Sequence, residues 1–302
     1  MRQRMLVAIS GAAAAVAVIG LLVVANQQGW FGGRAKRLLT RAQHAQQQGN
    51  VSEAQKNLEE LIATYRDSPW TDDAFLMLGQ IDETQQQWVE ARGMYQQLME
   101  RFPNSPLIPA AQTRLGTVNV ALLFSPTLTD LDMAYEVKPG DSLGRIAADH
   151  GTTVEVLKKA NGLKRDIIRP QQKLKVPKGK FSIVVDKSQN ELLLTEENRF
   201  VKSYPVATGK DNSTPVGTFK IVTKIPNPVW YKQGAVVPPE SPENILGSRW
   251  MGLNKPGYGI HGSTDPGVLG KQVTAGCVRM VNGDVEELFG IVPIGTDVTI
   301  VD

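Results

Sequence analysis

Residues 259–280 read GIHGSTDPGVLGKQVTAGCVRM, and this stretch contains Cys277, the only cysteine of the 302-residue chain, and His261, one of its three histidines. A thiol needs a base to react near neutral pH, because its ordinary pKa is about 8.5, and a neighbouring imidazole can lower that pKa by several units. A cysteine paired with a histidine is a common nucleophile for an acyl carbonyl. Taken alone, the two residues fit a buried structural cysteine beside a hydrogen-bonded histidine at least as well.

The residues around Cys277 suit acyl chemistry. Gly276 lets a substrate backbone approach closely. The backbone N–H groups of Gly276 and Cys277 can form an oxyanion hole, in which each donor is worth about 3–4 kcal/mol. Arg279 lies two residues further on, so its side chain points to the same side as Cys277 if the segment is extended. A guanidinium there suits a substrate carboxylate.

The region from residue 180 to residue 302 is predicted to be mainly β, as a sandwich or a barrel. Short apolar runs alternate there with Gly, Pro and Asn. One helix is expected after residues 282–284, where Asp284 can cap the segment from Val285 to Phe289. The predicted strands cover residues 182–186, 191–194, 200–206, 218–222 and 298–301.

This region resembles the L,D-transpeptidase catalytic domain, whose motif is His-Gly followed by Ser-x-Gly-Cys-x-Arg. The resemblance extends over residues 181–302. It implies that Cys277 is the nucleophile and His261 the general base. It also implies that Gly276 lines the site and that Arg279 contacts the donor peptide. The further matching segments are Ala207-Thr208-Gly209-Lys210, Thr214-Pro215-x-Gly217-x-Phe219, Asn227-Pro228-x-Trp230 and Gly247-x-Arg249-Trp250-Met251.

Several residues bear on how this site is held together. Thr274 stands where the family usually has Ser, and it keeps the hydroxyl for a hydrogen bond. His261 can be oriented by a backbone carbonyl or by Ser263. Asp265 is expected to be a turn residue, since Pro266-Gly267 follows it. Two resting states stay open: a neutral imidazole that accepts the thiol proton, and a preformed thiolate–imidazolium pair.

The resemblance implies a peptidoglycan transferase that acts in cell-wall organisation and cell shape, with no metal or organic cofactor. Cys277 would attack the peptide bond after the third residue of a stem tetrapeptide, D-Ala would leave, and a thioester would form. An amine on a neighbouring stem would then make a 3→3 cross-link. The alternatives are water as the acceptor, which gives an L,D-carboxypeptidase, a lysine of an envelope protein as the acceptor, and a non-catalytic wall-binding scaffold.

Residues 134–177 are predicted to form a strand–helix–helix–strand unit. The segment from Tyr135 to Val137 alternates as a strand does and ends at the turn Pro139-Gly140-Asp141. Ser142 and Thr153 can cap the two helices. The second strand covers the segment from Leu174 to Val176.

This unit carries three motifs: Tyr135-x-Val137-x-x-Gly140-Asp141-Ser142-Leu143, Asn161-x-Leu163 and Ile168-x-Pro170-x-Gln172-x-Leu174. With them it resembles a LysM domain, a βααβ module that binds N-acetylglucosamine chains in peptidoglycan or chitin. Gln171 stands where the family usually has Gly, and a left-handed backbone there costs about 1 kcal/mol. The resemblance implies that the glycan contacts are Gly140, Asp141, Ser142, Leu143, Ile168 and Pro170.

Residues 35–116 are predicted to be helical, because Glu, Gln, Ala and Leu dominate and apolar residues recur at helical spacing. A repeat of 37 residues relates Ser68-Pro69 to Ser105-Pro106 and Leu78-Gly79 to Leu115-Gly116. It resembles the tetratricopeptide repeat, whose usual period is about 34 residues. This implies a small surface on which an envelope protein docks, and the alternative is a plain helical spacer. Residues 117–133 are expected to be a linker.

Residues 1–30 are predicted to be a membrane anchor or a signal sequence, because residues 5–25 form an apolar stretch without a charge. A helix of that length rises about 31 Å, enough to cross the hydrocarbon core of a bilayer. The anchored form would place the protein in the cytoplasmic membrane of a bacterial cell envelope, with the catalytic domain outside the cytoplasm. The alternative is a secreted or periplasmic protein after signal cleavage.

The composition also bears on possible partners, disulfides and metal sites. The net charge is only +3, whereas nucleic-acid-binding proteins usually show a dense basic face, so nucleic acid is not an expected partner. A single cysteine excludes an intrachain disulfide and a zinc site built mainly from cysteine. The expected fold is multidomain: an N-terminal transmembrane helix, an α-helical repeat region, a small α/β LysM unit and a mainly-β catalytic domain.

Overall fold

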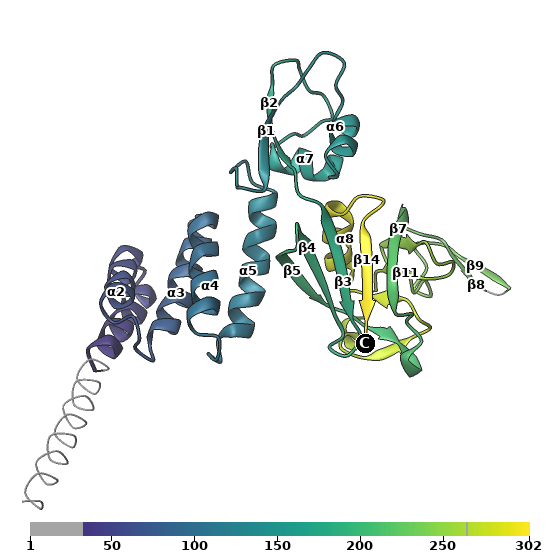
Figure 1. The fold of residues 1–302 in the computed structure, drawn as a ribbon. Coiled ribbons are helices and arrows are strands. Elements are labelled where there is room, and N and C mark those ends of the chain that lie inside the picture. The colour runs from purple at the N-terminus through teal and green to yellow at the C-terminus, as the bar shows by residue number, and fades with distance from the viewer. Residues whose placement is uncertain (1–32, 233, 264) are drawn as a thin grey trace, which may run out of the picture. The chain divides into compact units, whose positions relative to one another are not determined.

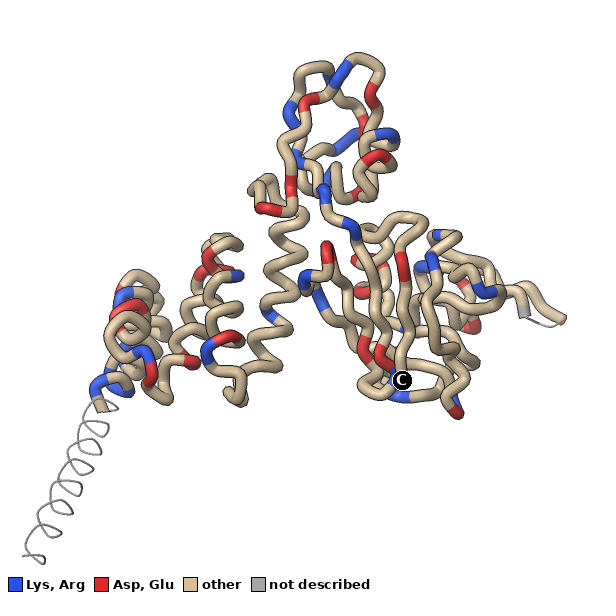
Figure 2. Tube along the Cα trace, in the orientation of Figure 1, with Lys and Arg blue, Asp and Glu red and all other residues tan. Residues whose placement is uncertain are grey.

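The computed structural model describes residues 33–232, 234–263 and 265–302 (Figure 1). The chain divides between Arg114 and Leu115 into two compact units. Acidic and basic side chains are interleaved along both units (Figure 2), in keeping with the small net charge.

The N-terminal unit is built from consecutive helices. α4 begins at Trp88, 37 residues after the start of α2 at Val51, so the predicted repeat is confirmed. Gly79 lets α3 and α4 pack closely, because a Cβ atom there would lie 2.6 Å from the ring of Tyr95. The helices cover residues 33–47, α2 (Val51–Thr64), α3 (Thr71–Thr84), α4 (Trp88–Arg101) and α5 (Ile108–Leu123), whose second half lies in the C-terminal unit.

The prediction of a linker over residues 117–133 is wrong in its first part, because α5 continues to Leu123. Val120 and Leu123 are buried in the core of the C-terminal unit, and this burial stabilises the helical conformation. The helix ends before Ser125-Pro126, as expected from the restriction that a proline places on the residue before it.

The predicted strand–helix–helix–strand order is confirmed. The hydroxyls of Ser142 and Thr153 accept hydrogen bonds from the N–H groups of Arg145 and Val156, as N-caps do. Gln171 has a left-handed backbone with φ of 70°, as expected at a position where the family usually has glycine. The elements are β1 (Asp132–Glu136), α6 (Leu143–Asp149), α7 (Val154–Ala160) and β2 (Lys173–Pro177), and β1 pairs antiparallel with β2.

Lys175 fastens β2 to the end of α5. Its buried Nζ atom donates hydrogen bonds to the carbonyl oxygens of Leu122 at 2.7 Å, Ser125 at 3.1 Å and Thr127 at 2.7 Å. It also lies 3.3 Å from a carboxylate oxygen of Asp132, which is buried as well. The last carbonyls of a helix have no partner within the helix. A single ammonium group thus bonds one of them, at Leu122, and two carbonyls of the segment that follows, and it neutralises a buried charge.

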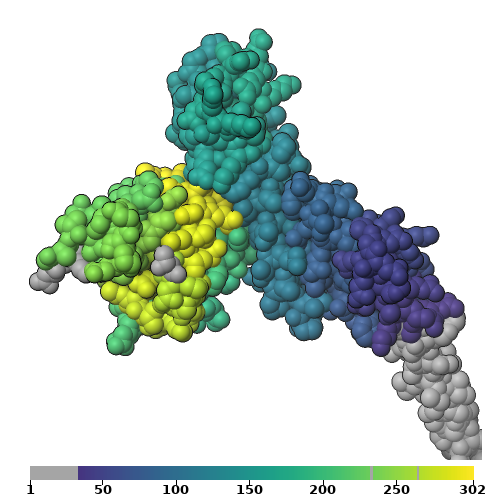
Figure 3. All heavy atoms as spheres, turned by 180° about the vertical axis from the view of Figure 1, so that it is seen from behind, coloured from purple at the N-terminus to yellow at the C-terminus, as the bar shows by residue number. Residues whose placement is uncertain are grey.

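Helix α7 also contacts the mainly-β region. The Thr153 hydroxyl donates a hydrogen bond to the carbonyl oxygen of Gly290, and Val156 is fully buried in the core of that region. Figure 3 shows the teal surface of residues 132–177 meeting the yellow surface of the C-terminal segment. The two parts therefore share apolar contacts.

The mainly-β region is built on one eight-stranded sheet, with the strand order β13-β11-β10-β7-β14-β3-β4-β5. β14 pairs parallel with β3, and β11 pairs parallel with β13. The sheet is therefore mixed, with parallel and antiparallel pairs, and the mainly-β prediction for this region is confirmed. Its strands are β3 (Phe181–Asp186), β4 (Glu191–Glu196), β5 (Arg199–Pro205), β7 (Gly217–Pro226), β10 (Arg249–Leu253), β11 (Gly259–His261), β13 (Val278–Arg279) and β14 (Asp297–Val301).

Shorter elements surround this sheet. Helix α8 (Asn282–Ile291) begins before Asp284, so the predicted cap at Asp284 is wrong; that residue lies in the first turn. The Asn282 side chain accepts a hydrogen bond from the N–H of Ser248 at 3.0 Å. The remaining elements are β6 (Thr208–Gly209), which pairs with β12 (Gln272–Thr274), β8 (Trp230–Lys232), which pairs with β9 (Ala235–Val237), and the 3-10 turns η1 (Lys210–Asn212) and η2 (Pro266–Val268).

The predicted location in a cytoplasmic membrane, with release into the periplasm as its alternative, is corrected. Within residues 33–232, 234–263 and 265–302, no helix is both long and apolar enough to cross a bilayer. The apolar stretch over residues 5–25, on which the predicted anchor or signal rested, lies outside the described residues.

We predict that Lys175→Met lowers the free energy of unfolding by about 3–5 kcal/mol, because it leaves the buried Asp132 carboxylate without its counter-charge. Chemical denaturation of the purified protein measures this change. Lys173→Met is the matched control, since Lys173 lies on the same strand and is exposed. Equal losses for both variants would contradict the role given to Lys175.

Candidate active site

Strand register brings the key residues onto one face of the sheet. Trp250 of β10 pairs with His261 of β11, and His261 pairs with Arg279 of β13. Residues paired across neighbouring strands point to the same face, as do residues two apart along a strand. Cys277 directly precedes β13 and lies two residues before Arg279. The expectation that Cys277 and Arg279 point to one side is therefore consistent with the register.

The alternate residues of the same strands form the opposite face. Met251, Ile260 and Val278 are fully or almost fully buried in the core. Burial of these three side chains fixes which face each strand presents, because a slip of one residue would turn them toward solvent. The hydrophobic core thus decides that His261 and Arg279 face outward together.

A cavity of about 490 Å³ opens on this outer face, and four of the predicted site residues line it. These four are His261, Thr274, Cys277 and Arg279. The rest of the wall is mostly apolar or aromatic, and it includes Tyr231, which the sequence motifs do not cover. Its position directly after Trp230, the last residue of a matching segment, is the one sequence signal for it. The remaining lining residues are Ile225, Pro228, Val229, Trp230, Tyr231, Ile245, Leu246, Trp250, Gly257 and Ala275.

The imidazole of His261 is buried, with only 2% of the residue exposed. Its Nδ1 atom lies 2.8 Å from the carbonyl oxygen of Gly262. A carbonyl only accepts hydrogen bonds, so Nδ1 carries the proton and Nε2 is left as the basic nitrogen. The sequence leaves two groups to orient His261, a backbone carbonyl and Ser263, and the structure shows the backbone carbonyl of Gly262 in this role. Burial, with a smaller contribution from the Arg279 charge, lowers the pKa of His261 to about 4, so the ring is neutral at pH 7.

The pKa of the Cys277 thiol shifts in the opposite direction to that of His261. Burial raises its pKa above the ordinary value, while the N–H of Gly259 and the charge of Arg279 act against this rise. The sulfur lies 3.5 Å from the carbonyl oxygen of Gly257, to which the thiol donates. Burial therefore disfavours both the imidazolium of His261 and the thiolate of Cys277, and the resting state is a neutral thiol with a neutral imidazole.

Thr274 and Gly276 shape the turn that carries Cys277. The Thr274 hydroxyl donates to the carbonyl oxygen of Cys277 at 2.6 Å and accepts from the N–H of Gly276 at 3.2 Å. The Gly276 N–H is thus engaged within the turn, which differs from the oxyanion role expected for it. Gly276 has φ of 125°, and a Cβ atom there would lie 2.8 Å from the ring of Tyr258. Glycine is required at this position for both reasons.

Ser263 is buried, but its hydroxyl belongs to the next turn. The hydroxyl accepts a hydrogen bond from the N–H of Asp265 at 3.1 Å. The Asp265 carboxylate in turn accepts from the N–H of Gly267 at 2.8 Å, as expected of a turn residue. Ser263 therefore supports the loop that follows β11 and is not among the residues that line the cavity.

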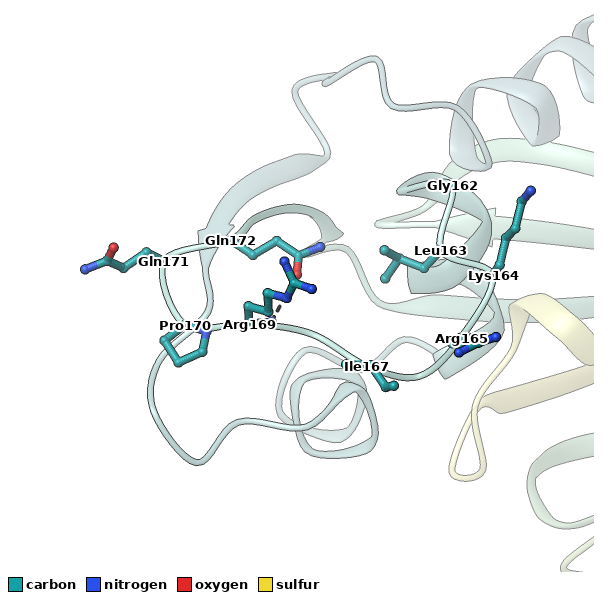
Figure 4. Close-up of a pocket in the computed structure, with 9 residues that line it drawn as sticks. All are labelled: Gly162, Leu163, Lys164, Arg165, Ile167, Arg169, Pro170, Gln171 and Gln172. Carbon is teal, nitrogen blue, oxygen red and sulfur yellow. Dashed lines mark hydrogen bonds between the residues drawn. The ribbon is translucent and has the colours of Figure 1, made fainter.

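A second hollow, of about 750 Å³, lies on the loop between α7 and β2 (Figure 4). Of the glycan contacts predicted from the sequence, Pro170 lines it, whereas Ile168 packs against the core of the βααβ unit. The predicted contacts in the first loop do not line the hollow. The lining residues are Gly162, Leu163, Lys164, Arg165, Ile167, Arg169, Pro170, Gln171 and Gln172.

The first-loop residues have structural partners instead. The Asp141 carboxylate accepts hydrogen bonds from the Tyr135 hydroxyl at 2.9 Å and from the N–H of Lys138 at 2.8 Å. Ser142 caps α6, and Leu143 is almost fully buried. Gly140, with φ of 86°, makes the turn itself.

The hollow between α7 and β2 is basic. Lys164, Arg165 and Arg169 line it, and no Asp or Glu is among its lining residues. Asp166 of the same loop is paired with Lys158 at 2.6 Å. Figure 4 shows Arg169 and Leu163 directed toward the space enclosed by the loop, and Gln171 directed away from it. An anionic ligand would meet uncompensated positive charge here.

Comparison with protein families gives three matches. Residues 180–300 match the L,D-transpeptidase catalytic domain. Residues 135–177 match the LysM domain, and residues 73–105 match the tetratricopeptide repeat. The two cavities described above therefore lie in the first and the second of these regions.

Two related proteins cover more than half of the chain. The protein YkuD of Bacillus licheniformis, which is assigned by name to the L,D-transpeptidases, is 40% identical over 176 residues, covering 56% of this chain and 98% of its own length. YkuD of Bacillus subtilis is 37% identical over 175 residues, covering 56% of this chain and 98% of its own. Among solved structures, an L,D-transpeptidase from Mycobacterium smegmatis aligns with a TM-score of 0.36 at 20% identity, over 44% of this chain and 64% of that one.

We predict that Cys277 reacts slowly with iodoacetamide at pH 7 and that the rate climbs until the pH exceeds the ordinary thiol pKa of about 8.5. A raised pKa lowers the thiolate fraction at neutral pH. Cys277 is the only thiol, so mass spectrometry follows it without ambiguity. His261→Gln should leave the midpoint nearly unchanged, because a neutral imidazole does not stabilise the thiolate by charge. A rate already constant between pH 5 and pH 7 would indicate a preformed ion pair instead.

Proposed function

This chain belongs to the L,D-transpeptidase family, and we propose that it cross-links peptidoglycan stem peptides through a thioester on Cys277. The observation that carries the proposal is the meeting of a thiol, a neutral imidazole and a guanidinium in one cavity, at Cys277, His261 and Arg279. These three groups supply the nucleophile, the proton acceptor and a cation for a substrate carboxylate.

The first half-reaction would be acyl transfer to sulfur. Nε2 of His261 takes the thiol proton as the sulfur bonds to the carbonyl carbon of the donor, and the carbonyl electrons move to oxygen. The N–H of Cys277 is the proposed donor to this oxyanion, because the Gly276 N–H is engaged with Thr274. When the tetrahedral intermediate collapses, the C–N bond breaks. The imidazolium then returns its proton to the departing amine of D-Ala.

Arg279 would bind the donor peptide. Its Nε atom is buried and has no hydrogen-bond partner among the described residues, and a buried donor without a partner is costly. A carboxylate of the bound donor would satisfy it with a charge-assisted hydrogen bond. The charge of Arg279 also disfavours protonation of His261, and it partly opposes the rise of the Cys277 pKa that burial causes.

The second half-reaction needs an acceptor, and we favour an amine over water. The wall of the cavity includes Trp230, Tyr231 and Trp250, together with aliphatic side chains. An apolar wall covered by a substrate stem excludes water from the thioester. The amine attacks the thioester carbon, the C–S bond breaks, and His261 passes the amine proton back to the sulfur. Hydrolysis to a tripeptide and transfer to a protein lysine are the competing outcomes.

The other regions would bring this site to its substrate. We propose residues 134–177 as a LysM module for the glycan strand, residues 180–302 as the catalytic domain and residues 35–116 as a docking surface for an envelope protein. The basic hollow beside α7 supports the first assignment, because Lys164, Arg165 and Arg169 would attract an anionic group on a cell-wall strand. The shared core around Val156 would hold the LysM module and the catalytic domain together.

We predict that purified protein incubated with stem tetrapeptides yields cross-linked dimers, measured by mass spectrometry of the products. Cys277→Ala should form neither dimers nor tripeptides, because the acyl intermediate needs the sulfur. Tripeptide as the only product would show that the protein is an L,D-carboxypeptidase. Product from Cys277→Ala would overturn the proposed nucleophile.

For the LysM module, we predict that the double variant Arg165→Gln with Arg169→Gln co-sediments less with purified sacculi than the wild type does. Added salt should weaken the co-sedimentation of the wild type in the same way, because it screens the charges. Point variants are preferable to deletion of the module, since deletion would uncover the apolar partners of Val156. Lys138→Gln, an exposed change on the first loop, is the matched control. An equal loss for Lys138→Gln would argue against the hollow as the binding site.

A further inference from the structure

The indole of Trp250 lies against the imidazole of His261. The two ring centroids are 5.8 Å apart and the planes are inclined by only 23°, so the rings are stacked. The two residues are register partners on β10 and β11, and both line the cavity that contains Cys277. One face of the imidazole is therefore covered by an aromatic side chain.

Two glycines make room for this indole. Gly252 and Gly259 are register partners of each other, and each lies two residues from Trp250 or His261 on the same face. A Cβ atom at Gly259 would lie 2.7 Å from Cζ2 of the indole, and one at Gly252 would lie 2.9 Å from its Nε1. Atoms cannot approach so closely without displacement, so a side chain at either position would move the ring.

The backbone does not require glycine at these two positions. Neither Gly252 nor Gly259 has a positive φ, unlike Gly276. Any residue could adopt their backbone conformation, so what excludes a side chain is the space around them. At Gly259 the indole and the carbonyl oxygen of Met251 fill that space, and at Gly252 the Thr223 hydroxyl and the indole do. The pair forms a slot, the Gly252–Gly259 slot, which holds the indole next to His261.

We propose that Trp250 is a positioning residue for the reaction: seated in the Gly252–Gly259 slot, it fixes the plane of the His261 imidazole so that Nε2 receives the proton of Cys277. The hydrogen bond from Nδ1 to the Gly262 carbonyl oxygen fixes one edge of the ring. That bond alone leaves the ring free to tilt about it. Stacking on the indole removes this freedom, and it also shields the imidazole from water.

The groups that face His261 set the expected direction of its titration. Arg279 faces it from β13, and Cys277 and Tyr231 line the same cavity. The Arg279 cation disfavours a second positive charge, and burial acts in the same sense and more strongly. Removing the indole admits water to one face of the imidazole, so the pKa of His261 should rise from about 4 toward its ordinary value of about 6.5.

The test compares Trp250→Leu, Trp250→Phe and Gly259→Ala with the wild type. The first readout is the pKa of His261 from NMR titration of the imidazole, assigned by the signal that His261→Gln removes. The second is the single-turnover rate of Cys277 acylation by a stem tetrapeptide across pH 4–9. We expect Trp250→Leu to raise the pKa and to slow acylation at its optimum by about 10²-fold, the usual effect of a misplaced catalytic group. Trp250→Phe should restore part of the low His261 pKa and part of the acylation rate.

Gly259→Ala probes the slot without changing Trp250, and it should shift both readouts in the direction of Trp250→Leu. Val222→Ala is the control, because Val222 is on β7, is 45% exposed and does not line the cavity. An unchanged pKa and acylation profile in a folded Trp250→Leu variant would overturn the proposal. The inference rests on the proposed function only for the acylation readout. A wild type that is not acylated would count against that function, while the titration would still decide whether Trp250 governs His261.

Discussion

The parallel pairing of β11 with β13 is the constraint on which the rest of the site depends. It places His261 beside Arg279 and fixes the start of β13 next to Cys277. The N–H of Met280 donates to the carbonyl oxygen of His261 at 2.9 Å, which extends the pairing beyond the strand. Residues distant in sequence thereby share one cavity, and the burial of Ile260 and Val278 on the other face prevents the register from slipping.

Burial is also the common cause of the two opposite pKa shifts. It disfavours the charged form of each group, so it lowers the pKa of His261 and raises that of Cys277. The pair therefore rests without charge and separates charge only when a substrate arrives. The N–H of Cys277 and the nearby Arg279 would then stabilise the negative charge at the moment it forms. This favours an enzyme whose thiol is protected from adventitious reagents between turnovers.

Much of this could be predicted from the sequence, and the failures have physical causes. The LysM caps at Ser142 and Thr153 were predictable because capping depends on local geometry alone. The extension of α5 to Leu123 was not, because it depends on burial against distant strands. The sequence suggests an oxyanion role for the Gly276 N–H. Its bond to Thr274 cannot be predicted, because that bond forms only when the turn is folded. Asn282 starts α8 in place of Asp284 for a similar reason: its partner Ser248 is far along the chain.

In the proposed reaction, Cys277 becomes acylated by the donor peptide while its neighbours supply the proton acceptor and the counter-charge. Intact-protein mass spectrometry, after rapid acid quench of the enzyme with a stem tetrapeptide, detects this acyl-enzyme. We expect a mass increase equal to the donor acyl group without D-Ala, located by peptide mapping on Cys277. Turnover of the tetrapeptide with no such adduct, or with the adduct on another residue, would contradict it.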